Sequence, residues 1–119
     1  MKILVVDDVA DIRMALEKVL TRNGHEVKSA DNGLQALNLL EIDDFDMLIT
    51  DIIMPKVDGI ELIKEVKAKY PDIKVIAMSG GGLAANYEQV FKAAQKYVTH
   101  FLEKPFSKTQ LINIIERME

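Results

Sequence analysis

The sequence predicts one α/β domain, residues 1–119, built on a doubly wound five-stranded parallel sheet with helices on both faces. Short apolar runs of strand length lie near 2–6, 25–30, 46–50, 73–78 and 97–102. Helical patterns separate and follow them, near 10–22, 33–41, 58–69, 84–96 and 107–118. No linker or internal repeat interrupts this alternation, which is typical of a parallel sheet covered on both sides.

The helices are predicted from apolar residues that recur three and four positions apart and so share one face. In the first helix they are Ile12, Ala15, Leu16, Val19 and Leu20, and in the last they are Leu111, Ile114, Ile115 and Met118. Turn-forming residues separate the elements at Asn23-Gly24, Asp31-Asn32-Gly33, Asp58-Gly59 and Pro71-Asp72. These breaks support the same division of the chain.

The order of the strands follows from how apolar each run is. The first, third and fourth runs (ILVV, MLIT and VIAM) are almost continuously apolar, as expected for strands buried on both faces. The second and fifth runs alternate in polarity, as expected nearer an edge. The predicted order is therefore 2-1-3-4-5, with right-handed crossovers. In that order the winding reverses between strands one and three, and open sheets bind ligands there, outside the carboxyl ends.

The composition excludes several classes of function. The formal net charge is −4 and no basic stripe with interleaved aromatic residues is present, so direct binding of nucleic acid is not expected. The absence of cysteine excludes disulfides and thiolate zinc sites and fits a reducing compartment. No apolar run approaches the roughly 20 residues of a membrane span, and the N-terminal segment is too short and acidic for a signal peptide. We therefore expect a cytoplasmic protein without membrane insertion.

Charged residues stand where three of the predicted strands end. Asp7 and Asp8 close the first apolar run, Asp51 closes the third, and Lys104 follows the fifth. A lone Asp at such a place is most often a helix N-cap, but three acids brought together repel by about 1–4 kcal/mol per pair and need a counterion. All-oxygen ligation with room for water suits Mg²⁺, with Mn²⁺ as an alternative. By contrast, the acids of the loop at 43–46 are expected to be solvated charges.

Five motifs, in order and in spacing, cover the whole chain: Asp7-Asp8, Asp51 with Met54-Pro55, Asp58-Gly59, Met78-Ser79-Gly80 and Lys104-Pro105-Phe106. Together they resemble the receiver domain of two-component response regulators, in particular its single-domain, chemotaxis-receiver-like members. An Asp-Asp pair alone carries little information, whereas the five-part set is specific. The resemblance implies a flavodoxin-like fold with the strand order given above.

The resemblance also implies a phosphoryl-accepting, metal-dependent site. Asp51 corresponds to the phosphoacceptor of that family. Asp8 is expected to hold the divalent metal directly, and Asp7 directly or through water. Asp51 itself and the backbone carbonyl of Ile53 complete the expected set of metal ligands.

The remaining motif residues resemble the family's switch. Ser79 corresponds to the hydroxyl residue that bonds the phosphoryl oxygen and moves on activation, and Lys104 to the lysine that pairs with the phosphoryl group. Phe101 takes the place of the aromatic residue that rotates inward when Ser79 moves. The bond between Lys104 and Pro105 is expected to be cis, as the family keeps it.

The function implied by the resemblance is a phosphorylation-dependent switch. A histidine kinase or phosphotransfer protein would phosphorylate Asp51, and the face formed by the predicted helix near 84–96, the fifth strand and the last helix would then bind a partner. That partner is a downstream protein or a detached output domain, and dimerisation on phosphorylation is left open. The chain is not expected to be an enzyme, apart from catalysing its own phosphoryl transfer and dephosphorylation.

Other functions are less compatible with the residues. An aspartate-nucleophile phosphatase would need a second acid two residues after the nucleophile, where Ile53 stands. A flavin binder would need a Ser/Thr-rich phosphate loop after the first strand, where Asp7 and Asp8 would repel a phosphate. A receiver-like docking module that acts without phosphorylation stays open as an alternative. Such a module is expected to lack the acceptor, the metal acids or the lysine, and this sequence retains all of them.

Overall fold

Five parallel strands form one sheet in the order β2-β1-β3-β4-β5, as predicted. The computed structural model describes residues 1–52, 59–79, 92 and 94–119. The strands are β1 (Lys2–Val6), β2 (Glu26–Ala30), β3 (Met47–Asp51), β4 (Lys74–Ser79) and β5 (His100–Glu103). Strands β1 and β3 pair directly, so the carboxyl ends of these two strands lie side by side at the reversal of winding.

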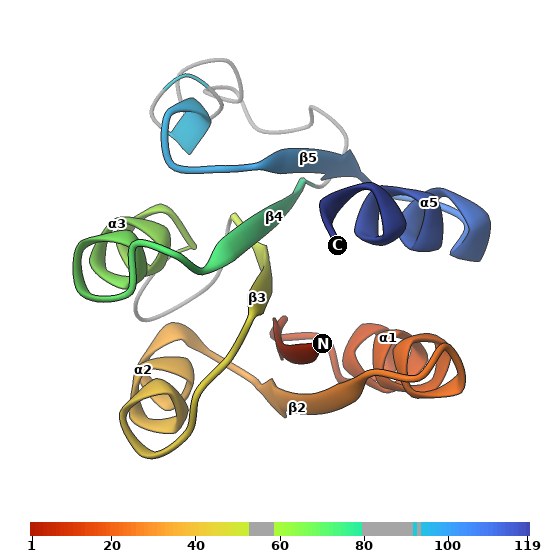
Figure 1. Cartoon of the computed structure of the whole chain (residues 1–119), viewed down its shortest axis with the longest axis horizontal. Coiled ribbons are helices and arrows are strands. Elements are labelled where there is room, and N and C mark those ends of the chain that lie inside the picture. Colours follow the sequence, from red (N-terminus) through yellow and green to blue (C-terminus); the bar gives the residue numbers. More distant parts are fainter. Residues whose placement is uncertain (53–58, 80–91, 93) are drawn as a thin grey trace.

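Helices cover both faces of this sheet (Figure 1). The helices with described bounds are α1 (Ala10–Arg22), α2 (Gly33–Ile42), α3 (Gly59–Lys69) and α5 (Lys108–Met118). Figure 1 shows α2 and α3 on one side of the sheet and α1 and α5 on the other. Of the helix predicted near 84–96, only Lys92, Ala94 and Gln95 are described as helical, and most of it lies outside the described residues. None of the described helices is long and apolar enough to cross a membrane.

Each face of the sheet has its own apolar core, because successive side chains of a strand point to opposite faces. Leu4 and Val6 of β1 pack with α2 and α3, whereas Ile3 and Val5 pack with α1 and α5. The central strands are therefore buried on both sides, and β2 and β5 are the edges. This distribution confirms the strand order that was predicted from apolar content.

Strand β5 begins three residues later than the predicted strand at 97–102. The N–H of Tyr97 donates to the Ala94 carbonyl at 2.9 Å, so Tyr97 still belongs to the turn after the preceding helical segment. Pairing with β4 is first made by Thr99, whose N–H donates to the Val75 carbonyl at 2.8 Å, and the register of β5 starts at His100. The sequence prediction failed here because alternating polarity does not distinguish a strand from the turn leading into it.

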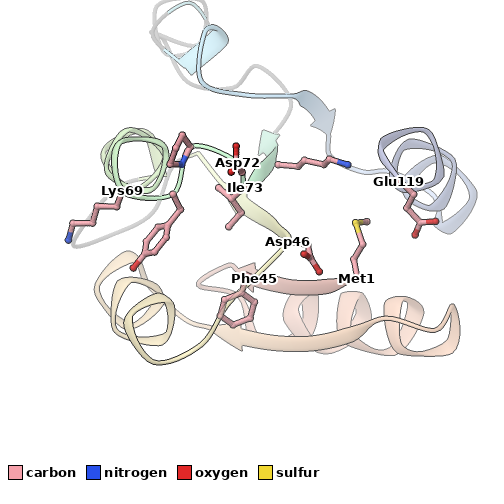
Figure 2. A pocket seen from close by; sticks show the side chains of 10 residues that line it. Met1, Phe45, Asp46, Lys69, Asp72, Ile73 and Glu119 are labelled. Carbon is pink, nitrogen blue, oxygen red and sulfur yellow. The ribbon is translucent and has the colours of Figure 1, made fainter.

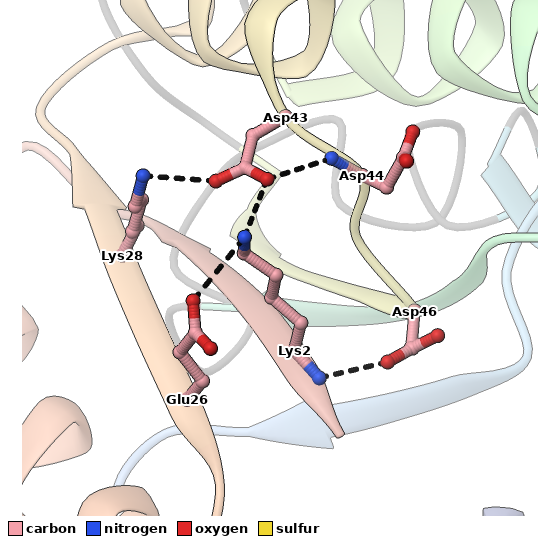
Figure 3. Close-up of polar contacts among 6 residues, drawn as sticks. All are labelled: Lys2, Glu26, Lys28, Asp43, Asp44 and Asp46. Carbon is pink, nitrogen blue, oxygen red and sulfur yellow. Dashed lines mark hydrogen bonds and ion pairs between the residues drawn. The ribbon is translucent and has the colours of Figure 1, made fainter.

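A network of charges at the amino end of the sheet corrects a second prediction (Figure 3). The Asp43 carboxylate accepts hydrogen bonds from the ammonium groups of Lys2 on β1 and Lys28 on β2, the latter at 2.8 Å. Lys2 also lies 3.2 Å from the Glu26 carboxylate. The hydrogen bonds from Lys2 and Lys28 hold the pKa of Asp43 below its usual value. Asp43 is therefore not a solvated loop charge, and it ties the connection between α2 and β3 to the first two strands.

Candidate functional site

Three carboxylates meet at the carboxyl ends of β1 and β3. Asp7 and Asp8 follow the last residue of β1, and Asp51 is the last residue of β3. One oxygen of each lies within 4.8 Å of the others. The convergence follows from the topology, because Val6 of β1 is in register with Thr50 of β3. A set of carboxylate oxygens at this spacing has the chemistry of a Mg²⁺ site.

Lys104 places a cation between two of these carboxylates. Its Nζ donates hydrogen bonds to Asp7 Oδ2 at 2.8 Å and to Asp51 Oδ2 at 2.9 Å. Burial lowers the pKa of Lys104, but the hydrogen bonds with Asp7 and Asp51 outweigh this effect and leave the pKa above its usual value. The lysine reaches the site because its backbone N–H donates to the Ser79 carbonyl at 2.8 Å, just beyond the end of β5. The peptide bond from Lys104 to Pro105 is cis.

The two acids that follow β1 have different surroundings. Asp7 is fully buried, and its Oδ1 accepts from the Val9 N–H at 2.9 Å while its Oδ2 accepts from Lys104. Asp8 is exposed, and the structure records no hydrogen bond for its side chain within the described residues. Asp7 is thus held in place by the protein, whereas the Asp8 carboxylate faces solvent beside it. An incoming cation would find one fixed ligand and one accessible ligand.

The backbone at the end of β3 is tightly enclosed. The Thr50 hydroxyl is buried and donates to the Asp51 carbonyl at 3.0 Å. Gly59, the first residue of α3, donates its N–H to the Ile52 carbonyl at 2.8 Å. A Cβ on Gly59 would lie 2.1 Å from the Asp51 carbonyl oxygen and 2.5 Å from Ile52 Cα. Glycine is therefore required here because the helix start packs directly against the backbone of Asp51.

The other predicted site residues are only partly described. Ser79 is the last residue of β4 and is 4% exposed, one strand away from Asp51. Phe101 is half-buried on β5, in register with Ala77 of β4. The expected carbonyl ligand, Ile53, lies outside the described residues, as does the segment 80–91 that follows Ser79.

The sequence prediction did not identify Arg13 or Thr50, and it treated Gly59 only as part of a turn. Thr50 could have been noticed as a polar residue that closes an apolar run. Arg13 could have been noticed as a cation in the first turns of a helix, where the helix dipole disfavours positive charge. No sequence signal shows that the start of α3 touches Asp51, because that contact joins separate elements.

Two hollows in the surface lie at different distances from the carboxylates. The hollow in Figure 2 is lined by Phe45, Asp46 and Ile73 among others, and lies at the amino ends of the strands, opposite the carboxylates. A second, mostly apolar groove runs between α1 and α5 and reaches Lys104. It is lined by Ile12, Ala15, Leu16, Val19, Phe106 and Leu111, with Asp11, Lys104, Pro105 and Lys108 beside them. Of these two hollows, the second approaches the carboxylate cluster, because Lys104 lines it and also bonds Asp7 and Asp51.

Comparison with known families identifies the chain. A family model described as the response regulator receiver domain matches residues 3–116. The chain belongs to this family. Receiver domains are in general signalling modules, not enzymes, and they interact with histidine kinases and downstream effectors. They generally bind Mg²⁺ at an acidic cluster, and this receiver domain has such a cluster in Asp7, Asp8 and Asp51.

Individual relatives include proteins of quite different length. The chain is 35% identical to the DNA-binding transcriptional regulator NtrC of Azospirillum brasilense over 97% of this chain. It spans only 23% of the length of that regulator. It is 38% identical to a chemotaxis protein CheY homologue of Campylobacter jejuni, over 98% of this chain and 90% of the homologue. The crystal structure of the response regulator TrrA from Thermotoga maritima, in complex with Mg²⁺-BeF, superposes with a TM-score of 0.86 at 29% identity, covering 99% of this chain and 98% of that one.

Proposed function

We propose that this receiver domain is a phosphorylation-dependent switch in which Asp51 accepts a phosphoryl group from a histidine kinase or a phosphotransfer protein. The observation that carries the proposal is the position of Lys104, whose ammonium group bridges Asp7 and Asp51 at 2.8 and 2.9 Å. Asp7, Asp8 and Asp51 are the residues that would hold Mg²⁺, with Mn²⁺ as a substitute. The related response regulator TrrA was crystallised in complex with Mg²⁺-BeF, which supports a divalent cation as a ligand of this receiver domain too.

The chemistry is an in-line transfer. An Asp51 carboxylate oxygen attacks phosphorus, a new P–O bond forms, and the P–N bond to the donor imidazole breaks as that nitrogen leaves. Negative charge accumulates on the phosphoryl oxygens during this step. Lys104 already lies within hydrogen-bonding distance of Asp51, so it can neutralise part of that charge without moving far. Mg²⁺ held by Asp7, Asp8 and Asp51 would add further positive charge to the same site.

The donor must reach Asp51 across a neighbouring surface, and the groove between α1 and α5 is the described hollow that extends to Lys104. Val9 and Met14, near the start of α1, are exposed apolar residues, at 45% and 65%. We propose that the donor protein covers the groove together with Val9 and Met14 while its histidine contacts Asp51. Replacing Met14 by Ala should slow transfer from a phosphorylated histidine phosphotransfer protein and leave labelling by acetyl phosphate unchanged. Equal slowing with both donors would show that Met14 acts on the site instead.

After phosphorylation, we propose that Ser79 and Phe101 relay the change to the surface. Ser79 ends β4 and Phe101 lies on the adjacent edge strand β5. An edge strand is accessible to a partner, so a rearrangement there can alter binding of a downstream protein or output domain. Dimerisation through the same face is one form such binding can take.

The test of the proposed function is intact mass spectrometry after incubation with acetyl phosphate, with and without Mg²⁺, on the wild type and Asp51→Asn. We expect one Mg²⁺-dependent phosphoryl adduct that is absent from the variant. A folded wild-type protein that binds Mg²⁺ but gains no adduct would contradict the proposal. It would instead favour a docking module that acts without phosphorylation.

A further inference from the structure

Arg13 lies beside the acidic site without a role in the function proposed above. It is the fourth residue of α1 and is half-buried. Its Nη1 donates a hydrogen bond of 2.7 Å to the backbone carbonyl of Asp7. Among the described residues, no carboxylate forms an ion pair with its guanidinium group. The charge of Arg13 is therefore directed at the backbone of the site and not at a neutralising partner.

The position of Arg13 is unfavourable for the helix itself. The first turn of a helix carries a partial positive charge, so a cation near the start of a helix is disfavoured. Helix α1 also lacks a side-chain cap, because the residue before it is Val9. A residue that breaks a local rule in a folded protein commonly serves something outside its own element. For Arg13 the contact outside its own helix is the hydrogen bond that its guanidinium group donates to the Asp7 carbonyl.

Fixing this carbonyl fixes the direction of the following residue. The Asp7 carbonyl and the Asp8 N–H belong to one planar peptide unit, so neither can turn without the other. The backbone of Asp7 has a second bond, in which its N–H donates to the Ala30 carbonyl of β2 at 3.2 Å. The backbone of the turn that carries both acids is thus held both by β2 and by Arg13. Asp8, which is exposed and has no recorded side-chain bond within the described residues, has no other restraint of this kind.

We propose that Arg13 is a positioning residue of the acidic site. Through the peptide between Asp7 and Asp8 it orients the Asp8 carboxylate toward Asp51, and its positive charge, with that of Lys104, offsets the three clustered carboxylates. Both effects favour phosphorylation of Asp51, because the transfer adds negative charge to the cluster. The expected effect on phosphorylation rests on the function proposed above. The orientation of Asp8 by Arg13 concerns the metal-free protein and does not depend on that function.

The test compares Arg13→Met with Arg22→Met. Both remove one positive charge from α1, but Arg22 is exposed in the last turn of the helix. In the metal-free protein, amide exchange at Val9, whose N–H is bonded to Asp7 Oδ1, should accelerate about tenfold in Arg13→Met relative to the core amide of Ile49. The same variant should accept phosphoryl from acetyl phosphate about tenfold more slowly at saturating Mg²⁺. Arg13→Lys should recover part of both losses, and Arg22→Met should match the wild type.

The outcomes separate this inference from the proposed function. If Arg13→Met and Arg22→Met behave alike in both measurements, Arg13 has no positioning role. If Arg13→Met lowers the melting temperature but leaves the Val9 exchange ratio and the labelling rate unchanged, the residue is merely structural and the inference is wrong. If the wild type itself is not phosphorylated, the proposed function fails, and the exchange measurement alone decides the role of Arg13.

Discussion

Replacing Gly59 by Ala should lower the stability of the fold and displace Asp51, the proposed phosphoacceptor. The new Cβ would lie 2.1 Å from the Asp51 carbonyl oxygen and 2.6 Å from the Ile52 carbonyl oxygen. Carbon–oxygen contacts lie near 3.3 Å, so the start of α3 and the end of β3 must separate by roughly 1 Å. The clashing atoms belong to the backbone, which cannot relax by changing a rotamer. We expect a loss of about 3 kcal/mol, at the upper end of overpacking substitutions.

The variant Gly24→Ala provides the matched control. Gly24 has a φ of +88° and nothing within 4 Å of an added Cβ, so its substitution strains the backbone without creating a clash. The strain should cost about 1–2 kcal/mol, far from the carboxylates. Both variants should therefore melt at lower temperature, by about 4 °C for each kcal/mol. Only Gly59→Ala should also slow labelling by acetyl phosphate, by about tenfold to a hundredfold, because roughly 1 Å of misplacement is expensive in catalysis.

The assay is thermal unfolding followed by circular dichroism, combined with the labelling rate at saturating Mg²⁺ measured well below both melting temperatures. A labelling rate for Gly59→Ala equal to that of Gly24→Ala would refute the reasoning, because it would show that the helix start can move without moving Asp51. A melting temperature of Gly59→Ala within about 2 °C of the wild type would refute the expected clash itself.

Three further predictions concern charge. The pKa of Lys104 is raised, so its contribution to the free energy of unfolding is complete below the ordinary pKa of 10.5 and is lost as the pH rises through the higher folded value. Replacing Lys104 by Met should therefore abolish this alkaline loss of stability, measured by denaturant titration at several pH values. At neutral pH without Mg²⁺ the substitution Lys104→Met should lower the free energy of unfolding by about 3 kcal/mol. The pKa of Asp43 is lowered by Lys2 and Lys28, so its contribution to the free energy of unfolding is complete above the ordinary value of 3.8 and is lost as the pH falls below it. Asp43→Asn should therefore reduce the loss of stability at acid pH, and an unchanged loss would contradict the network of Figure 3. Mg²⁺ at a hundred times its dissociation constant should stabilise the wild type by about 2.7 kcal/mol, and Asp8→Asn should remove most of this gain; full retention would exclude Asp8 as a ligand.

The element order and strand order could be predicted because both depend on local patterns. The continuous apolar run from Ile3 to Val6 marks a strand buried on two faces, and the structure places these residues in two separate cores. The prediction failed for the start of β5, since its first residue depends on hydrogen bonds to β4. It also failed for Asp43, whose partners Lys2 and Lys28 are distant in sequence.

The convergence of the carboxylates was accessible from the sequence for the same reason. Once β1 and β3 are neighbours, residues at their carboxyl ends must be close, and Asp7, Asp8 and Asp51 stand there. The different surroundings of Asp7 and Asp8 were not accessible, because the two residues are adjacent and chemically identical. Their difference comes from contacts with Val9 and Lys104.

The sequence by itself thus determined the fold class, the strand order and the edge of the sheet where the carboxylates gather, since periodicity and apolar content are properties of short segments. Only the tertiary structure decided how that edge is held together. The bridge from Lys104 to two acids, the bond from Arg13 to the Asp7 carbonyl and the packing of Gly59 on Asp51 join elements that are remote along the chain or turned toward each other by the fold. Such contacts depend on how separate elements are placed relative to one another in space, which no pattern of residue types encodes.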